Sequence, residues 1–117
     1  MDLNRVVITG LGAVTPIGNN LSEYWDGLLS GKSGSGSITH FNPEKFKTKF
    51  ACEIKDYVPA NFFDRKTVRK LDKFTQYALI ASDEAIADAQ LDLDVIDKYR
   101  TGVIWGAGIG GLETFQN

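Results

Sequence analysis

The sequence contains a single cysteine, Cys52, and a single histidine, His40, among its 117 residues. One cysteine excludes an internal disulfide, which fits a reducing compartment. One cysteine and one histidine also provide neither a Cys/His metal cluster nor the partners of a catalytic triad. Cys52 lies in an alternating apolar stretch with no helix start nearby, so we expect a small buried side chain rather than a nucleophile. We expect His40 in a loop or in the core.

Long apolar runs and a strong excess of one charge are also missing. No run approaches the ~20 apolar residues of a membrane-spanning helix, and the first residues lack the basic and apolar regions of a secretory signal. Lys and Arg number 13 and Asp and Glu 15, so the formal net charge is −2. Bulk charge therefore favours neither nucleic acid nor a membrane surface as a partner. We expect a soluble, cytoplasmic protein that binds neither.

The apolar patterns predict a short series of helices and strands. Residues 5–9 and 101–105 are β-branched or apolar runs that stop at glycines, which is typical of buried parallel strands. Residues 64–89 keep apolar side chains at i, i+3 and i+4, which predicts one long helix. A short amphipathic helix with an asparagine cap is predicted over 21–29, and a short strand over 49–54.

The order strand, long helix, strand indicates an α/β layered fold with a parallel sheet and a right-handed crossover. Two strands cannot form a stable parallel sheet that is covered on both faces. The residues after Gly111 also begin a helical pattern that stops at Asn117. We therefore expect residues 1–117 to be a truncated, opening part of a larger protein, with apolar faces uncovered around Ile80, Ile104 and Trp105.

A glycine-rich segment follows the second predicted strand. Gly106-Ala107-Gly108-Ile109-Gly110-Gly111 satisfies the G-x-G-x-x-G pattern, in which glycines let backbone amides approach a pyrophosphate at a helix start. The acidic residue that completes this fingerprint lies ~20 positions later. Glycines also allow close packing of the backbone beneath a helix or a ligand cavity. Taken alone, the segment favours packing over nucleotide binding.

Four cations share one face at the start of the predicted long helix. Lys66, Arg69, Lys70 and Lys73 are spaced at i, i+3, i+4 and i+7. A solvated helix face tempered by nearby aspartates is the ordinary interpretation. Cations near a helix N-terminus, however, lie at the unfavourable end of the helix dipole. Four of them on an acidic protein therefore also indicate a local positive patch for an acidic partner.

Taken together, the segments closely resemble the N-terminal part of β-ketoacyl-acyl-carrier-protein synthases, and most specifically the type II elongating enzymes of fatty-acid synthesis. The resemblance covers essentially the whole chain. Its matching segments are Arg5-Val6-Val7-Ile8-Thr9-Gly10-Leu11-Gly12, Thr15-Pro16-Ile17-Gly18-Asn19, Gly31-Lys32-Ser33-Gly34, His40-Phe41, Lys49-Phe50-Ala51, Lys55-Asp56-Tyr57, Asp64-Arg65-Lys66, Arg69-Lys70-Leu71-Asp72, Gln76-Tyr77-Ala78 and Gly106-Ala107-Gly108-Ile109-Gly110-Gly111. Ile109 favours the type II enzymes, because type I enzymes tend to have glycine there.

The resemblance implies a thiolase-like layered fold (αβαβα), of which residues 1–117 are the first part of the N-terminal half, and a homodimer. It implies an acyltransferase that loads an acyl group onto a cysteine, decarboxylates malonyl-acyl-carrier protein and joins the carbanion to the acyl group. That cysteine and two histidines would lie beyond residue 117, so the resemblance implies no catalytic residue in this chain. No nicotinamide cofactor and no metal are implied.

The resemblance also assigns two binding roles within the chain. Lys66, Arg69 and Lys70 look like the dock for the acidic acyl-carrier protein. Ile109, with Gly108 beside it, looks like the substrate-binding position at the acyl pocket, where a side chain yields to a long acyl chain. Two alternatives stay open: a non-catalytic relative of the condensing enzymes, and a nucleotide-binding oxidoreductase that uses the loop 106–111.

Overall fold

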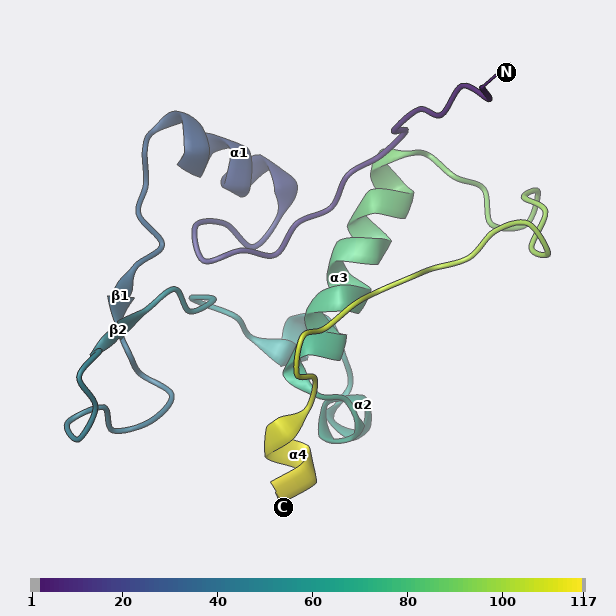
Figure 1. Cartoon of the computed structure of the whole chain (residues 1–117). Coiled ribbons are helices and arrows are strands. Elements are labelled where there is room, and N and C mark those ends of the chain that lie inside the picture. The colour runs from purple at the N-terminus through teal and green to yellow at the C-terminus, as the bar shows by residue number, and fades with distance from the viewer. Residues whose placement is uncertain (1–2, 117) are drawn as a thin grey trace.

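The computed structural model describes residues 3–116, as helices joined by long extended segments (Figure 1). The central element is a helix, α3, against which much of the remaining chain lies. The elements in chain order are α1 (Leu21–Leu29), β1 (Gly36–Ser37), β2 (Phe50–Ala51), the 3-10 turn η1 (Pro59–Asn61), α2 (Arg65–Lys70), α3 (Lys73–Asp88) and α4 (Leu112–Gln116). None of the described helices is long and apolar enough to cross a membrane.

Helix α1 confirms the predicted short helix and its asparagine cap. The Asn20 side chain accepts a hydrogen bond from the Glu23 amide at 2.9 Å, which satisfies one of the free donors of the first turn. The Glu23 carboxylate in turn accepts from the Asn19 amide at 2.8 Å. The helix ends where Gly31 adopts a positive φ of 66°, a conformation that glycine reaches without strain.

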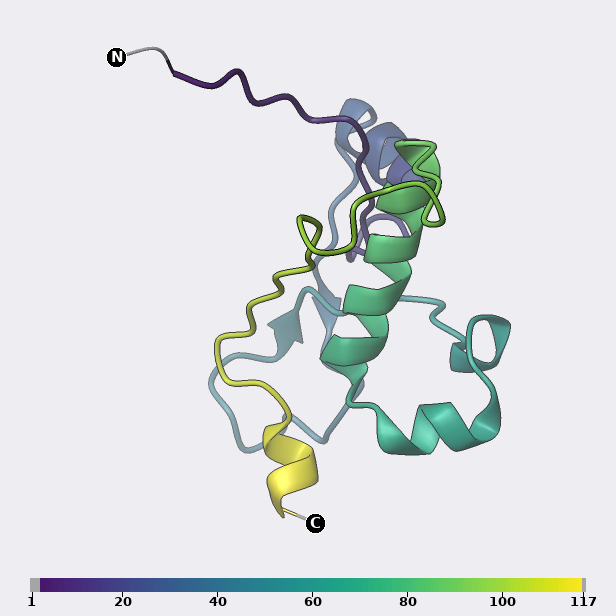
Figure 2. The ribbon, with the colours of Figure 1, turned by 90° about the vertical axis from the view of Figure 1, so that its right-hand side faces the viewer.

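The predicted long helix over 64–89 is wrong in one respect, because the structure divides it into two helices. Leu71 and Asp72 have extended backbone angles, with ψ of 129° and 153°, so the chain turns between α2 and α3. Figure 2 shows α2 lying across the end of α3 rather than continuing it. The apolar spacing persists through the break, and therefore the sequence pattern did not reveal it.

The two predicted parallel strands are not formed within the described residues. Residues 5–9 and 101–105 are extended but pair with no neighbour, and Val6, Ile8 and Ile104 are 89%, 83% and 99% exposed. A strand needs a hydrogen-bonded partner, and here neither segment has one. The ladder that does form is a two-residue antiparallel pair, with Gly36 opposite Ala51 and Ser37 opposite Phe50. Its second strand, β2, covers Phe50 and Ala51 of the strand predicted over 49–54.

The buried core is small and belongs to α3. Its buried apolar residues are Ala78, Ile80 and Ala81. The accessible surface is 10005 Å² for 12.9 kDa, whereas a compact monomer of that mass would expose roughly 6300 Å². The Cα radius of gyration is 17.5 Å, against about 13 Å for a compact domain of this length. The chain thus leaves much apolar surface uncovered.

The N-terminal glycine segment packs directly on the backbone of α3. A Cβ added at Gly10 would lie 2.7 Å from the Ala89 Cβ, and one added at Gly12 would lie 2.9 Å from the Ala85 amide nitrogen. Figures 1 and 2 show the same close approach along the upper half of α3. Glycine facing alanine therefore brings two backbones together, which is the packing role that glycines allow.

Carboxylates on α3 hold this segment in place. The Leu11 amide donates to Asp88 at 2.9 Å, and the Ala13 amide donates to Glu84 at 2.8 Å. The second oxygen of Glu84 accepts from the Leu21 amide at 2.7 Å, at the first residue of α1. Glu84 consequently joins α3, the glycine segment and α1 through one side chain.

Candidate functional site

Helix α2 begins at a charged cap. The Asp64 carboxylate accepts hydrogen bonds from the Lys66 and Thr67 amides at 2.8 and 3.0 Å and from the Thr67 hydroxyl at 2.7 Å. The hydroxyl and the two amides hold the pKa of Asp64 below its usual value. A negative charge therefore persists at the positive end of a six-residue helix that carries four cations.

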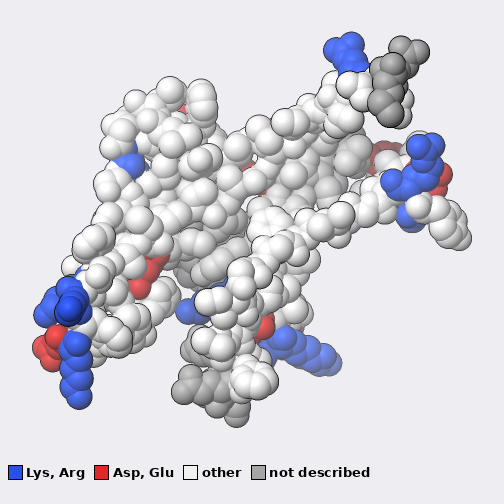
Figure 3. Space-filling model, in the orientation of Figure 1, with Lys and Arg blue, Asp and Glu red and all other residues white. Residues whose placement is uncertain are grey.

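The outer face of α2 carries Lys66, Arg69 and Lys70, which are all exposed; we call these three residues the basic face. Arg69 and Lys70 lie in the last turn, so the break in the predicted long helix places them at the favourable, negative end of a helix dipole. Lys73 belongs to α3 and lies outside this face. Figure 3 shows Lys and Arg near α2, at the loop between β1 and β2, and at the loop that follows α3 on the right of the view.

The cations of the basic face are not neutralised within the described part of the chain. Among the side chains that the structure describes, one ion pair forms within 4 Å, between His40 and Glu53. The basic face thus keeps its positive field.

A buried glutamine that sequence reasoning missed connects α2 to α3. Gln76 is 3% exposed, and its Nε2 donates to the carbonyl oxygens of Leu71 at 2.8 Å and Val68 at 3.3 Å. Its Oε1 accepts from the Tyr57 hydroxyl at 2.6 Å. Burial, together with the neighbouring Tyr77, raises the pKa of Tyr57, so its hydroxyl keeps the proton that it donates. The available signal was a lone amide side chain on the apolar side of a helical pattern.

The glycine loop 106–111 runs into α4 beside the break between α2 and α3. The Thr114 hydroxyl donates to the Asp72 carboxylate, and Gly110 has a positive φ of 75° with Phe74 about 4.0 Å from where its Cβ would be. Ile109 is 81% exposed, so its side chain does not lie in a cavity of this chain. The structure thus brings the predicted acyl-pocket loop near the end of the basic face, without enclosing a pocket around Ile109.

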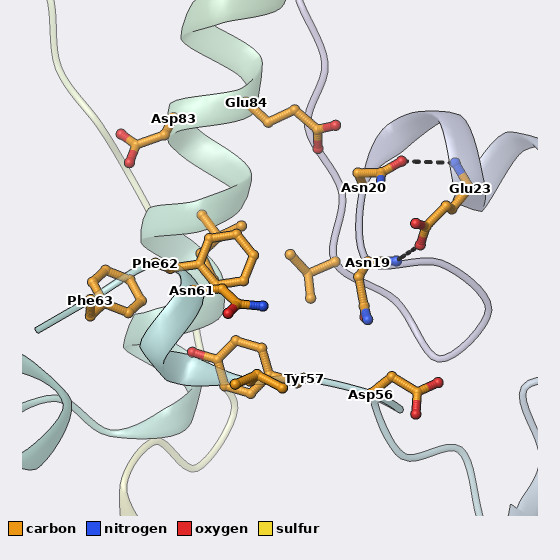
Figure 4. Close-up of a pocket in the computed structure, with 13 residues that line it drawn as sticks. Asn19, Asn20, Glu23, Asp56, Tyr57, Asn61, Phe62, Phe63, Asp83 and Glu84 are labelled. Carbon is orange, nitrogen blue, oxygen red and sulfur yellow. Dashed lines mark hydrogen bonds between the residues drawn. The ribbon is translucent and has the colours of Figure 1, made fainter. Parts of the chain in front are cut away.

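A cavity of about 480 Å³ lies between the N-terminal loop, α3 and the segment around η1 (Figure 4). Its lining includes four carboxylates, from Glu23, Asp56, Asp83 and Glu84, and no Lys or Arg. Glu23 and Glu84 already accept hydrogen bonds from backbone amides. The lining would repel the carboxylate of a malonyl group or a phosphate, so this cavity does not suit an anionic substrate. Groups of three or more metal-ligating side chains are absent from the described residues.

Comparison with known proteins identifies the family. Residues 3–117 match the profile described as "Beta-ketoacyl synthase, N-terminal domain". The chain belongs to the β-ketoacyl synthase family.

Three curated relatives of this synthase chain carry the same name. The chain is 43% identical over 117 residues to a 3-oxoacyl-[acyl-carrier-protein] synthase 2 of Synechocystis sp.. This match covers 100% of the chain and 28% of that protein. Proteins of the same name from Staphylococcus aureus and Coxiella burnetii are each 45% identical, over 112 and 116 residues. These matches cover 96% and 99% of the chain but 27% and 28% of those proteins. The chain therefore spans less than a third of the length of these relatives.

Two solved structures share the synthase fold. The ishigamide ketosynthase/chain length factor aligns with a TM-score of 0.67 at 36% identity, covering 75% of this chain and 22% of that chain. A type II polyketide acyl-carrier protein in complex with its ketosynthase gives a TM-score of 0.57 at 24% identity, covering 78% and 23%. The thiolase-like fold class inferred from the sequence is thus confirmed, although the described residues do not pair its parallel strands.

The remaining candidate residues of the synthase chain fall outside any reactive pair. Cys52 is exposed, so the expectation of a buried thiol is wrong, because the short β1–β2 pair leaves its outer side uncovered. His40 lies in a loop, with its Nε2 3.9 Å from Glu53. Cys52 and His40 line one open depression but share no hydrogen bond. The loop 106–111 follows an unpaired segment instead of a strand, so it lacks the context that the dinucleotide fingerprint requires.

Proposed function

We propose that the protein containing this chain is a 3-oxoacyl-[acyl-carrier-protein] synthase that elongates fatty acids. It loads an acyl group onto a cysteine outside residues 1–117, decarboxylates malonyl-acyl-carrier protein and joins the two carbon units. The observation that carries this proposal is the 43–45% identity, over 96–100% of the chain, to relatives that all bear that name. Residues 1–117 contribute binding surfaces to this reaction, and by themselves they are inactive.

The basic face is the proposed dock for the acyl-carrier protein. Three exposed cations on one helix suit an acidic partner, and charge complementarity of this kind steers association. The solved ketosynthase that is 24% identical was captured with an acyl-carrier protein, which supports a carrier as a partner of the family. Docking here would place the carrier beside the break between α2 and α3, near the glycine loop.

Ile109 and Gly108 are the proposed substrate-binding residues at the acyl pocket. A stiff β-branched side chain among glycines can shift with the backbone when a long acyl chain enters. Its 81% exposure in this chain leaves it free to face a pocket wall supplied by the rest of the protein.

A cytoplasmic homodimer is the proposed assembly. The resemblance to the condensing enzymes supports the dimer, and the free Cys52 thiol suits a reducing compartment. Light scattering of the full-length protein at several concentrations measures this, and a monomeric mass throughout would contradict the dimer.

A second candidate is a non-catalytic relative of the condensing enzymes. It is favoured by the 36% identity to the ishigamide ketosynthase/chain length factor. The full-length protein incubated with acyl-carrier-bound acyl thioester separates the two by intact mass. An acyl adduct on the protein, followed by 3-oxoacyl product when malonyl-acyl-carrier protein is added, supports the synthase. Binding of carrier without an adduct supports the non-catalytic relative.

A further inference from the structure

We propose that Gln76 and Tyr57 are positioning residues that hold α2 at its angle to α3 and so set the direction of the basic face toward the carrier protein. This inference rests on the proposed docking function of Lys66, Arg69 and Lys70. It assigns a role to two side chains that lie outside both the basic face and the loop 106–111.

The break between α2 and α3 creates the need for such a link. The last carbonyls of a helix have no partner within it, and α2 is a helix of six residues that cannot hold its own direction by length. Gln76 lies in the first turn of α3 and binds the carbonyls of Val68 and Leu71 at the end of α2. One side chain of α3 thus caps the other helix.

The orientation of the Gln76 amide is determined by its partners. Two carbonyl oxygens require a donor, which Nε2 supplies, and the remaining Oε1 accepts from the Tyr57 hydroxyl at 2.6 Å. The reversed amide would bring its oxygen against two carbonyl oxygens, which is repulsive. In a site that is 3% exposed, water cannot replace these bonds, so the geometry is enforced.

Tyr57 connects the link to the chain that leads into α2. Its ring meets Tyr77 of α3 edge-on at 5.0 Å and stacks on Phe62 at 6.1 Å. Phe62 follows η1, two residues before the Asp64 cap of α2. Helix α2 is therefore held at both ends, by Tyr57 and Phe62 before it and by Gln76 after it.

This link determines the direction in which the basic face points. The three cations project from a single short helix, so a change in its tilt moves all three relative to the acidic surface of the carrier. Loss of the link should weaken carrier binding while leaving the chemistry on small substrates intact.

The test compares Gln76→Leu and Tyr57→Phe in the full-length protein with carrier-bound and pantetheine-bound acyl substrates. Each hydrogen bond is worth about 0.5–1.5 kcal/mol, so the KM for the carrier-bound substrate should rise roughly two- to tenfold. The kcat and KM for the pantetheine substrate should not change. Tyr99→Phe removes the same hydroxyl at a fully exposed position and serves as the control. Tyr57→Phe keeps the ring contacts, so it stays informative if Gln76→Leu fails to fold.

The variant Lys66→Glu/Arg69→Glu/Lys70→Glu separates this inference from the docking proposal. If Gln76 acts through the basic face, adding Gln76→Leu to that variant produces no further rise in carrier KM. Equal losses with both substrates would show a purely structural role and overturn the inference. A carrier KM that responds to charge reversal but not to Gln76→Leu or Tyr57→Phe overturns the positioning role alone. A carrier KM that ignores charge reversal overturns docking, and the positioning role with it.

Discussion

Gly12 lies so close to α3 that a methyl group in place of its hydrogen would overlap the backbone of Ala81 and Ala85. Gly10 has the same relation to Ala85 and Ala89. Between them, the Leu11 amide is bound by Asp88. Small residues on both sides thus allow a contact that the carboxylates of α3 then secure.

We expect Gly12→Ala to destabilise the full-length protein by about 1–3 kcal/mol, the usual cost of overpacking a close contact. Thermal unfolding measures the loss. Gly36→Ala is the matched control, because a Cβ there would meet only the end of the Lys55 side chain, at 3.9 Å. Equal melting temperatures for the two variants would contradict the close contact described for Gly12.

Ile109→Phe tests the proposed role of Ile109 at the acyl pocket. Overpacking costs ~1–3 kcal/mol, and if the ring obstructs only the longer substrate, kcat/KM for long acyl chains should fall roughly ten- to a hundredfold. Short-chain activity should be preserved. Acyl transfer to the full-length enzyme with short and long carrier-bound substrates, next to a thermal melt, measures both. A uniform slowdown with a lowered melting temperature would instead indicate that Ile109 packs in a core or an interface.

Tyr57 and Tyr77 should make stability depend on alkaline pH. Burial raises the pKa of both hydroxyls above the usual value of 10.0. Above that pH the unfolded chain loses protons that the folded chain retains, so the free energy of unfolding falls as pH rises. The stabilisation that these hydroxyls provide is fully present below about pH 10, and it is lost as the pH rises toward their raised pKa values in the folded chain. Urea melts from neutral to alkaline pH measure the free energy of unfolding, which should fall less steeply with pH for Tyr57→Phe than for the exposed-site control Tyr99→Phe. Equal slopes for the two variants would contradict this expectation.

At the scale of elements, α2 is defined by its ends. Asp64 starts it with three hydrogen bonds, and the extended Leu71 and Asp72 stop it. Between these limits the half-buried Thr67 and Val68 face inward and the basic face points outward. Helix α2 therefore presents its cations on one face, and the segments that pack against it set its orientation.

Reversing charge at Lys66, Arg69 and Lys70 should raise the apparent KM for carrier-bound substrates. The steering that these cations provide is long-range and is screened by salt, so the defect should resemble the effect of added salt on the wild type. Turnover of short pantetheine thioesters should change little. Steady-state kinetics with both substrate kinds at two ionic strengths decides this, and equal losses with both kinds would mean that α2 is structural.

At the scale of the whole molecule, residues 1–117 lack cover for their apolar surface. Side chains as large as Ile104 and Trp105 are 99% and 52% exposed. Ile80, in contrast, is 9% exposed, so the expectation that it belongs to an uncovered face is wrong: the chain itself covers that part of α3. Exposed apolar side chains lie in the extended segments and also on helices α1 and α4, for example Leu29 and Phe115, which are 70% and 91% exposed.

Expressed alone, residues 1–117 should aggregate or remain loosely packed, because exposed apolar area of this extent favours association. Thermal unfolding and amide dispersion in NMR spectra of the isolated chain measure this. A sharp, cooperative melt with well-dispersed signals would contradict the expectation.

The sequence by itself determined the features that depend on neighbours along the chain. Asn20 and Asp64 begin helices because their side chains reach amides two or three residues ahead. The ordered segments from residue 5 to residue 111 were sufficient to indicate the synthase family, which the comparison over residues 3–117 then confirmed.

Only the tertiary structure decided the features that depend on distant partners. The apolar spacing of a continuous helix runs through the break at Leu71 and Asp72. The hydrogen bonds that stabilise the break come from Gln76, which binds the Leu71 carbonyl, and from Tyr57, which binds Gln76 from 19 residues away in the sequence. Residues 5–9 have the composition of a strand, yet a strand exists only where another backbone pairs with it. The exposure of Cys52 likewise depends on whether another segment of the chain covers it, and not on the polarity of its own side chain. Contacts between residues far apart in sequence leave no local pattern, and therefore these features had to be observed in three dimensions.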